Sequence, residues 1–333
     1  MPTLYVIEPE ARVEKEYDRI LITREDEQIF RTPLRYISDV VLVGRAGITT
    51  PALHALLQAD VPLILVSRTG KMLGKLQPKT GGNLALRQAQ YRKNDDRLFG
   101  LQFSKSIVSG KIHNQLIFAQ RLLRRRPALQ MNKTITQLKQ KLKEIENVNT
   151  IDSLMGIEGQ AARIYFSVFR QALNPEWSFK ERTRRPPRNP VNALLSLGYT
   201  FLGHAIEASL EIVGLDPYLG YFHAEKYGRP ALVLDMMEEF RTPIVDSMVL
   251  DLLNHQIIKP EYYTIHNKGV TLNDEGLRLF FRRFSSKLEQ LIKPRYLKRK
   301  HGISYRKVFE VQARRLSQYI MGNESSYQPF RWR

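Results

Sequence analysis

Four side chains in three separate stretches of the sequence have the types and spacing of a metal site. Glu158 borders an apolar stripe with helical spacing, and His223 follows a turn that is rich in glycine and aromatic residues. Asp235 and Glu238 lie three residues apart, so a helix would place both on one face. Carboxylates together with one imidazole suit Mg²⁺ or Mn²⁺, with positions left for water and phosphate oxygens. The four residues therefore indicate phosphodiester chemistry, in which a cation polarises the phosphate and activates an attacking hydroxyl.

Each stretch taken alone also has an ordinary structural explanation. Glu158 could stabilise the first turn of its helix through the helix dipole. His223 could be a hydrogen-bonded packing residue among its aromatic neighbours. The acids after residue 234 could form a solvated helix face on which Glu238 pairs with Arg241. Spacing alone leaves these alternatives open.

The distribution of charge indicates a polyanionic partner. The 333 residues include 52 Lys and Arg and 33 Asp and Glu, a net charge of +19, and such an excess is typical of proteins that bind nucleic acid. Segments 85–143 and 278–333 each carry +12, whereas 1–84 carries +1 and 144–277 carries −6. An acidic segment between two basic ones would repel phosphate unless it bound a divalent cation. The alternative is that these acids lie on solvated helix faces.

Composition excludes several other classes of protein. The chain has no cysteine, which excludes disulfides, thiolate zinc sites, iron–sulfur clusters and cysteine nucleophiles. No apolar run approaches the roughly 20 residues that a membrane-spanning helix needs. Glu8, Glu10 and Arg12 stand where a signal peptide would have its apolar core. We therefore expect a cytoplasmic protein without a membrane partner.

The elements that must position these residues change in character along the chain. Short apolar or β-branched runs in the first 75 residues predict strands, with one helix over 51–59 capped by Thr50. Beyond a polar, glycine-rich segment the apolar residues recur with helical spacing, with a cap at Asn132, a cap at Asn189 and a terminator at Gly214. We predict an α+β protein with four parts: a β domain over 1–75, a linker over 76–84, an all-α catalytic domain over 85–322 and a tail over 323–333.

Four blocks of sequence around the candidate residues resemble the motifs of a known family. The blocks are EGQAARIY at 158–165, RRPPRNPVNALLSLGY at 184–199, GLDP at 214–217 and LDMMEEFR at 234–241. Over nearly its whole length the chain resembles the CRISPR-associated endonuclease and integrase family, the larger of the two near-universal spacer-acquisition proteins. The resemblance implies metal ligands at Glu158, His223 and Glu238, a further catalytic acid at Asp235, and a phosphate contact at Lys226.

The resemblance also implies a fold, a reaction and partners. It implies an N-terminal β-sandwich that forms a homodimer, and a helical domain that holds Mg²⁺ or Mn²⁺. A 3′-hydroxyl of a short captured double-stranded DNA would attack a phosphodiester of the CRISPR repeat, and a small ferredoxin-like companion protein would bridge two dimers. We expect the basic segments to bind DNA together with a cluster of arginines, namely Arg182, Arg184, Arg185 and Arg188.

Two other functions fit part of the sequence. A structure-selective nuclease that acts on branched or junction DNA in repair would use the same site, because only the attacking group differs, water in place of a 3′-hydroxyl. A non-catalytic DNA-binding scaffold would need the basic segments alone. The joint presence of the four candidate residues argues against the scaffold.

Overall fold

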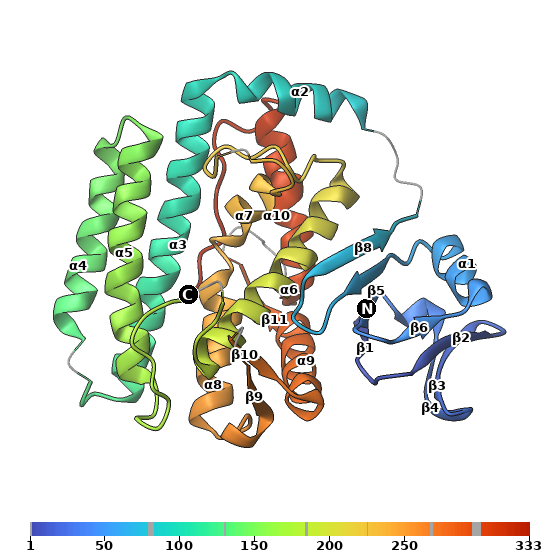
Figure 1. The fold of residues 1–333 in the computed structure, drawn as a ribbon. Coiled ribbons are helices and arrows are strands. Elements are labelled where there is room, and N and C mark those ends of the chain that lie inside the picture. Colours follow the sequence, from blue (N-terminus) through green and yellow to red (C-terminus); the bar gives the residue numbers. More distant parts are fainter. Residues whose placement is uncertain are drawn as a thin grey trace. The chain divides into compact units, whose positions relative to one another are not determined.

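The chain divides into two units that interleave along the sequence. One unit comprises Met1–Gly81 and Ile258–Glu289, and the other comprises Gly82–Ile257 and Gln290–Arg333. The computed structural model describes residues 2–78, 83–129, 131–183, 186–224, 226–266, 269–294 and 301–333. Its helices and strands are drawn in Figure 1.

Two four-stranded sheets make up most of the first unit. In one sheet β1, β5 and β7 run parallel and β8 pairs antiparallel with β7. In the other, β3 pairs antiparallel with β4 and β2, and β6 lies parallel to β2. The bounds are β1 (Thr3–Val6), β2 (Arg12–Glu16), β3 (Arg19–Arg24), β4 (Glu27–Pro33), β5 (Asp39–Val43), β6 (Gly47–Ile48), β7 (Leu63–Val66) and β8 (Met72–Leu76), with a 3₁₀ turn over Leu34–Tyr36 and helix α1 over Thr50–Gln58.

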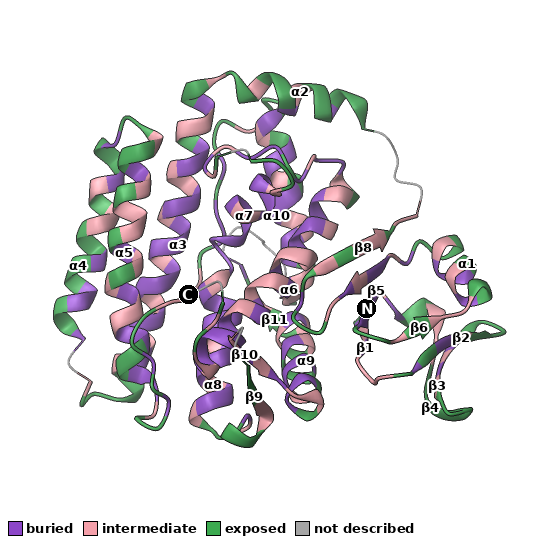
Figure 2. Ribbon diagram, viewed as in Figure 1, coloured by how far each residue is buried: buried purple, intermediate pink, exposed green. Residues whose placement is uncertain are grey.

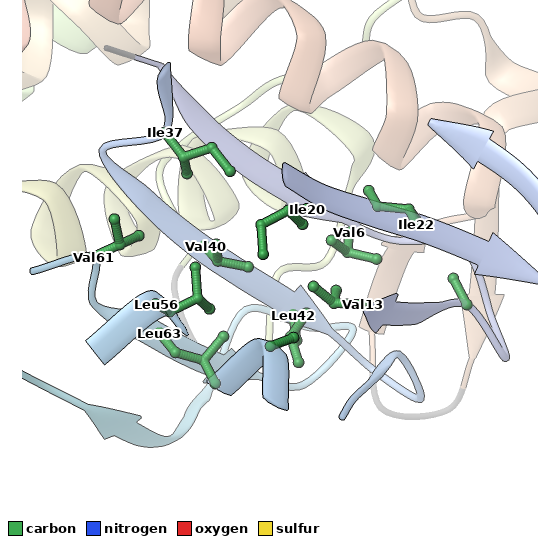
Figure 3. Close-up of a cluster of buried hydrophobic side chains, with 12 residues drawn as sticks. Val6, Val13, Ile20, Ile22, Ile37, Val40, Leu42, Leu56, Val61 and Leu63 are labelled. Carbon is green, nitrogen blue, oxygen red and sulfur yellow. The ribbon is translucent and has the colours of Figure 1, made fainter. Parts of the chain in front are cut away.

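One hydrophobic core joins the two sheets. Val40 and Leu42 of β5 are buried in the same cluster as Val13 of β2 and Ile20 of β3 (Figure 3). Leu56 of α1 completes this cluster. Short apolar or β-branched runs predict the strands at β1, β3, β5 and β7, whereas the other four strands are shorter or more polar and were not predicted. The sandwich layering itself stays a prediction.

The first unit also includes a later segment of the chain. A 3₁₀ turn (Pro260–Tyr262), the hairpin of β9 (Tyr263–His266) and β10 (Gly269–Leu272), and helix α9 (Asp274–Glu289) belong to it. Tyr5 stacks on Phe281 with ring centroids 4.6 Å apart, and Arg278 Nε donates to Glu8 Oε1 at 2.6 Å. Periodicity assigns 258–289 to the helical domain because a helix and its neighbours look alike in sequence, whichever unit they pack against. The predicted catalytic domain over 85–322 is therefore interrupted.

Helices form most of the second unit. Helices α3, α4 and α5 pack side by side, and α6 packs against α10 (Figure 1). Among the described residues no helix is both long and apolar enough to cross a membrane. The bounds are α2 (Leu84–Asn94), α3 (Arg97–Arg125), α4 (Asn132–Glu144), α5 (Ile151–Ala172), α6 (Pro190–Val213), α7 (Ala231–Met237), α8 (Ser247–Asn254) and α10 (Tyr305–Ile320), with a 3₁₀ turn over Ile145–Asn147, a π-helical turn over Arg241–Asp246, and the short strands β11 (Leu291–Ile292) and β12 (Ile303–Ser304).

The helix ends test the predicted caps. Asn189 caps α6 through its side chain, which accepts from Asn192 N at 2.8 Å, and Gly214 ends that helix at φ +94°. Both were predicted. The cap of α1 is Thr49 rather than Thr50, because Thr50 already has helical backbone. Asn132 is likewise the first residue of α4 and caps nothing.

The predicted tail over 323–333 is packed into the second unit. Asn114 of α3 is completely buried, and its amide donates to Glu239 O at 2.7 Å and to Phe330 O at 3.0 Å. Its Oδ1 accepts from Trp332 N at 2.7 Å. Phe330 is buried with Tyr327, and Figure 2 shows that burial continues along the middle of α3. The segment is therefore part of the structure that surrounds α3.

Replacing Asn114 by alanine is expected to lower the free energy of unfolding by about 3 kcal/mol, because three backbone groups, two of them buried, lose a hydrogen-bond partner at once. Urea unfolding of the wild type and the variant at one pH measures the difference. Ser109→Ala, on the same helix as Asn114, is the control. It removes only the exposed hydrogen bond that Arg331 donates to the Ser109 hydroxyl. A loss equal to that of the control would contradict this account of the segment.

Candidate metal centre

Glu158 lies in the interior of α5, at some distance from the start of the helix. The helix begins at Ile151, where Thr150 caps it by accepting from Ser153 N at 3.2 Å. Glu158 is therefore two turns in, where the helix dipole has little effect, and the explanation as a first-turn acid is wrong. Its carboxylate is mostly buried and forms an ion pair with Lys111 of α3.

Glu238 follows directly after α7 and is almost completely buried. Its Oε2 lies 2.5 Å from Lys111 Nζ, and its Oε1 accepts from Arg241 Nε at 3.0 Å. Burial by itself raises the pKa of Glu238, but the attraction of Arg241 and Lys111 outweighs it, and the pKa lies below its usual value. The carboxylate is thus charged at neutral pH. The predicted pair with Arg241 is present, whereas a solvated acidic face is wrong, because the side chain is only 4% exposed.

Asp235 and His223 form one hydrogen-bonded unit. The Asp235 carboxylate is completely buried and accepts from the backbone N–H groups of Tyr221 at 2.7 Å and Phe222 at 3.0 Å. Its Oδ1 also accepts from His223 N at 2.9 Å and lies 2.8 Å from His223 Nδ1. A carboxylate can only accept, so Nδ1 carries the proton of this bond, and in the neutral imidazole Nε2 keeps its lone pair. Nε2 lies 3.8 Å from Glu238 Oε1.

A glycine permits this arrangement. A Cβ at Gly220 would lie 2.8 Å from Asp235 Oδ2 and 2.7 Å from the carbonyl carbon of Ala231. Contacts that short do not occur, so a side chain at Gly220 would displace the Asp235 carboxylate. The aspartate therefore positions the histidine, and all its hydrogen-bonding capacity is used within the chain.

The three remaining groups fit a divalent cation. Glu158 and Glu238 both pair with the single ammonium of Lys111, so their carboxylates border one cation position. Glu238 Oε2 is buried and, despite its ion pair, receives no well-aligned hydrogen bond. With His223 Nε2, the set is two carboxylates and one imidazole, which suits Mg²⁺ or Mn²⁺. No group of three or more acidic or histidine side chains in the described parts of the chain is already at metal-binding spacing.

Sequence reasoning missed one basic residue at this centre and placed another on a solvated surface. Lys111 lies four residues after Ile107, on the apolar face of α3. That position is a signal, because a lysine on a buried face needs a charged partner. Burial lowers the pKa of Lys111, but its attraction to Glu238 and Glu158 prevails and raises it. Arg241 was considered only as a surface partner of Glu238.

A buried network holds Arg241 in place. The Arg241 guanidinium lies 4.6 Å from the centroid of the Tyr199 ring. Asp246, at the end of the π-helical turn, accepts from Tyr199 at 2.5 Å and from Tyr165 at 2.7 Å. Burial raises the pKa of Asp246. Both tyrosines come from the motif blocks, although neither was predicted to have this role.

Glu239 points away from the cation position. Its carboxylate accepts from the Tyr327 hydroxyl at 2.6 Å, from Gln312 Nε2 at 3.1 Å and from the backbone N–H of Phe330. Burial raises its pKa to about 7. This acid therefore anchors the segment around Phe330 and is no candidate ligand.

The predicted DNA-binding residues differ in exposure. Arg182 turns inward, with Nη1 2.8 Å from Asn192 Oδ1 and Nη2 3.0 Å from Ser196 Oγ, so its head group braces the loop before α6. Arg188 and Lys226 are exposed. Lys226 borders a shallow pocket with three tyrosines and an arginine. Arg184 and Arg185 lie outside the described residues.

Comparison with known proteins identifies the family. The family model described as "CRISPR associated protein Cas1" matches residues 4–286. CRISPR-associated endonuclease Cas1 3 of Thermus thermophilus is 36% identical over 98% of this chain and 96% of its own length. The chain belongs to the Cas1 family. CRISPR-associated endonuclease Cas1 1 of Chlorobaculum tepidum is a further relative, 32% identical over 99% of this chain and 98% of its own.

Solved structures share the fold of this Cas1 family member. A casposase bound to integration product has a TM-score of 0.87 at 20% identity and covers 100% of this chain and 95% of its own. A Cas1 protein from Thermotoga maritima has a TM-score of 0.81 at 24% identity, covering 98% of each chain. The Cas6-RT-Cas1–Cas2 complex reaches 0.80 at 27% identity over 99% of this chain and 36% of that one. Small sheets at the N-terminus and a mostly helical later part, as predicted, are thus shared with Cas1 structures.

Proposed function

We propose that this protein is a metal-dependent DNA endonuclease and integrase that inserts short captured DNA fragments into a CRISPR repeat. One observation carries the proposal: in a chain of the Cas1 family, Glu158 and Glu238 share a single cation position beside His223 Nε2. The relatives are named as endonucleases, and integration product is bound in the casposase structure. Both names agree with phosphodiester chemistry at this centre.

The residues at the proposed centre have different roles. Glu158, His223 and Glu238 would hold Mg²⁺ or Mn²⁺, which when bound supplies charge to a phosphodiester and lowers the pKa of an attacking hydroxyl. Asp235 keeps the proton on Nδ1, so that Nε2 faces the centre. Arg241 is held against Glu238 by its ion pair and by Tyr199. In the joining reaction the new bond forms between the fragment's 3′-oxygen and phosphorus, and the bond from phosphorus to the repeat strand's 3′-oxygen breaks.

An integration assay tests the function. The full chain, the small companion protein that we propose as its partner, a short duplex with free 3′-hydroxyl ends and a supercoiled plasmid with a CRISPR repeat are mixed with Mn²⁺ or Mg²⁺. We expect the duplex to be joined to the repeat, and the product to vanish with chelator. A duplex with 3′-deoxy ends is the control, because it lacks the attacking group. Cutting of branched DNA without joining would favour a repair nuclease instead.

Asp235 provides a sharp test of the geometry. Asp235→Asn is expected to lower both Mn²⁺ affinity and the joining rate by about 10-fold to 100-fold, because a carboxylate bonded to the far nitrogen of a histidine ligand orients its ring. Gly220→Ala should act in the same direction, since its new Cβ would displace the same carboxylate. Gly100→Ala, where the new Cβ meets nothing within 4 Å, is the matched control. Wild-type affinity in Asp235→Asn would contradict the positioning role.

The first unit is proposed to form the homodimer. Its sequence over 1–84 is nearly neutral at +1, so it is poorly suited to bind DNA. Tyr17, Ile29, Phe30 and Tyr36 are between 47% and 90% exposed around β4, which is an edge strand. Unpaired edges and exposed apolar side chains favour pairing with a second copy.

Light scattering at micromolar concentration is expected to give about twice the chain mass of 38.8 kDa. Ile29→Lys combined with Phe30→Lys should shift the measured mass toward the monomer, because the new charges would be buried in the interface. A wild-type mass of one chain would contradict the dimer.

In this proposal the protein acts in the cytoplasm, where the CRISPR repeat and the captured fragments meet.

A further inference from the structure

Lys111 is a cation buried between the two carboxylates that would hold a metal. Its side chain is 10% exposed, and its ammonium pairs with Glu158 and with Glu238 Oε2. Burying an ammonium is costly unless opposite charges surround it. Two carboxylates on one ammonium supply that compensation, and the ammonium in turn keeps the carboxylates from repelling each other.

Arg241 has a different relation to the centre. It pairs with the other oxygen of Glu238 and lies over the ring of Tyr199, so its position does not depend on Glu158. Of the cationic side chains that the structure describes, only Lys111 pairs with both acids. Lys111 and Arg241 balance the charges of Glu158 and Glu238, so an added divalent cation would enter a set that is already neutral.

We propose that Lys111 is an internal counter-cation, which holds Glu158 and Glu238 in place before metal binds and must withdraw when a divalent cation takes its position. This inference rests on the proposed function. An ammonium and a divalent ion repel strongly at a few ångströms, so both cannot lie between the same two carboxylates. The lysine ammonium is carried on a flexible stem of four carbons, so it can move away without moving α3. Lys111 thereby competes with the metal and sets its affinity.

The competition is tested by measuring Mn²⁺ binding directly. Isothermal titration calorimetry and the electron paramagnetic resonance signal of free Mn²⁺ are recorded for the full chain and for two variants. Lys111→Met keeps most of the length of the side chain and removes its charge. Lys105→Met removes one positive charge from the same helix, where Lys105 Nζ donates only to Glu146 O at 3.0 Å on the surface. Neither readout depends on catalysis.

We expect Lys111→Met to bind Mn²⁺ at least about tenfold more tightly than the wild type, because the metal no longer displaces an ion pair. Lys105→Met should match the wild type. Without metal, Lys111→Met should melt at a lower temperature than the wild type. Added Mn²⁺ should raise the melting temperature of the variant by more than that of the wild type. Equal or weaker Mn²⁺ binding by Lys111→Met would overturn the inference.

The inference and the proposed function fail in different ways. Absence of saturable Mn²⁺ binding in all three proteins would contradict the proposed metal centre itself, and the inference with it. Binding in all three with equal affinity would contradict only the role of Lys111. If Lys111→Met does not fold without metal, Lys111→Gln replaces it, because an amide can still donate to the carboxylates while carrying no charge. The same tenfold gain in affinity is then expected.

Discussion

Replacing His223 by alanine is expected to abolish metal-dependent cleavage and joining of DNA while DNA binding stays within about twofold of the wild type. The imidazole is the one nitrogen ligand of the proposed centre, and its Nε2 is directed there by the bond from Nδ1 to Asp235. Without it, two carboxylates remain beside a competing ammonium, and a divalent cation would be held weakly. Joining of a labelled duplex to a repeat plasmid measures the first effect, and a gel-shift titration measures the second.

A second histidine provides the control. His255 follows α8, is exposed, and pairs with Asp251 one helical turn earlier. His255→Ala should join DNA at the wild-type rate. Glu158→Gln and Glu238→Gln should share the defect of His223→Ala, because each removes one charge from the cation position. A His223→Ala protein that joins DNA as fast as the wild type would show that the centre is assigned wrongly.

The affinity for duplex DNA is expected to fall steeply with salt, by about a thousandfold between about 50 and 200 mM if six phosphates are contacted. Segment 85–143 carries +12, and much of that charge is exposed along α2, α3 and α4. Each neutralised phosphate releases counterions, which gives a log–log slope of about −0.9 per contact. Fluorescence anisotropy of a labelled duplex over a salt series measures the slope.

Single exposed arginines locate the contact. Arg124→Ala and Arg125→Ala, at the exposed end of α3, should each reduce the slope by about 0.9 if that end meets phosphate. Arg24→Ala in the nearly neutral first unit should leave the slope unchanged. An affinity that hardly responds to salt would contradict an electrostatic DNA interface. It would indicate that the excess of positive charge serves solubility alone.

The buried carboxylates of the candidate centre are each compensated by a different set of partners. Glu238 can remain ionised in the interior only because Arg241 and Lys111 surround it, and its lowered pKa reflects that attraction. Asp235 has different partners, since its carboxylate accepts from three backbone N–H groups and contacts one imidazole. One carboxylate is therefore available to a cation and the other is committed to the backbone, although only two residues separate them in the sequence.

The sequence by itself determined the chemical types at the centre and the local ends of several elements. Residue types and spacing indicate a metal site, and the blocks around them carry the family resemblance, which implies Glu158, His223 and Glu238 as its ligands. Asn189 and Gly214 bound α6 as their chemistry demands, because a cap and a left-handed terminator act within one turn of the chain. The excess of positive charge is likewise a property of composition alone.

Only the tertiary structure decided which of these groups face one another. It placed Lys111 of α3 between two acids that lie 47 and 127 positions away along the chain, and turned Arg182 inward to brace a loop. It also joined 258–289 to the N-terminal sheets. Periodicity reports which face of an element is apolar, whereas the partner of that face depends on the packing free energy of the whole chain. For that reason the candidate ligands could be named from motifs in the sequence, while the lysine ammonium that lies between two of them could not.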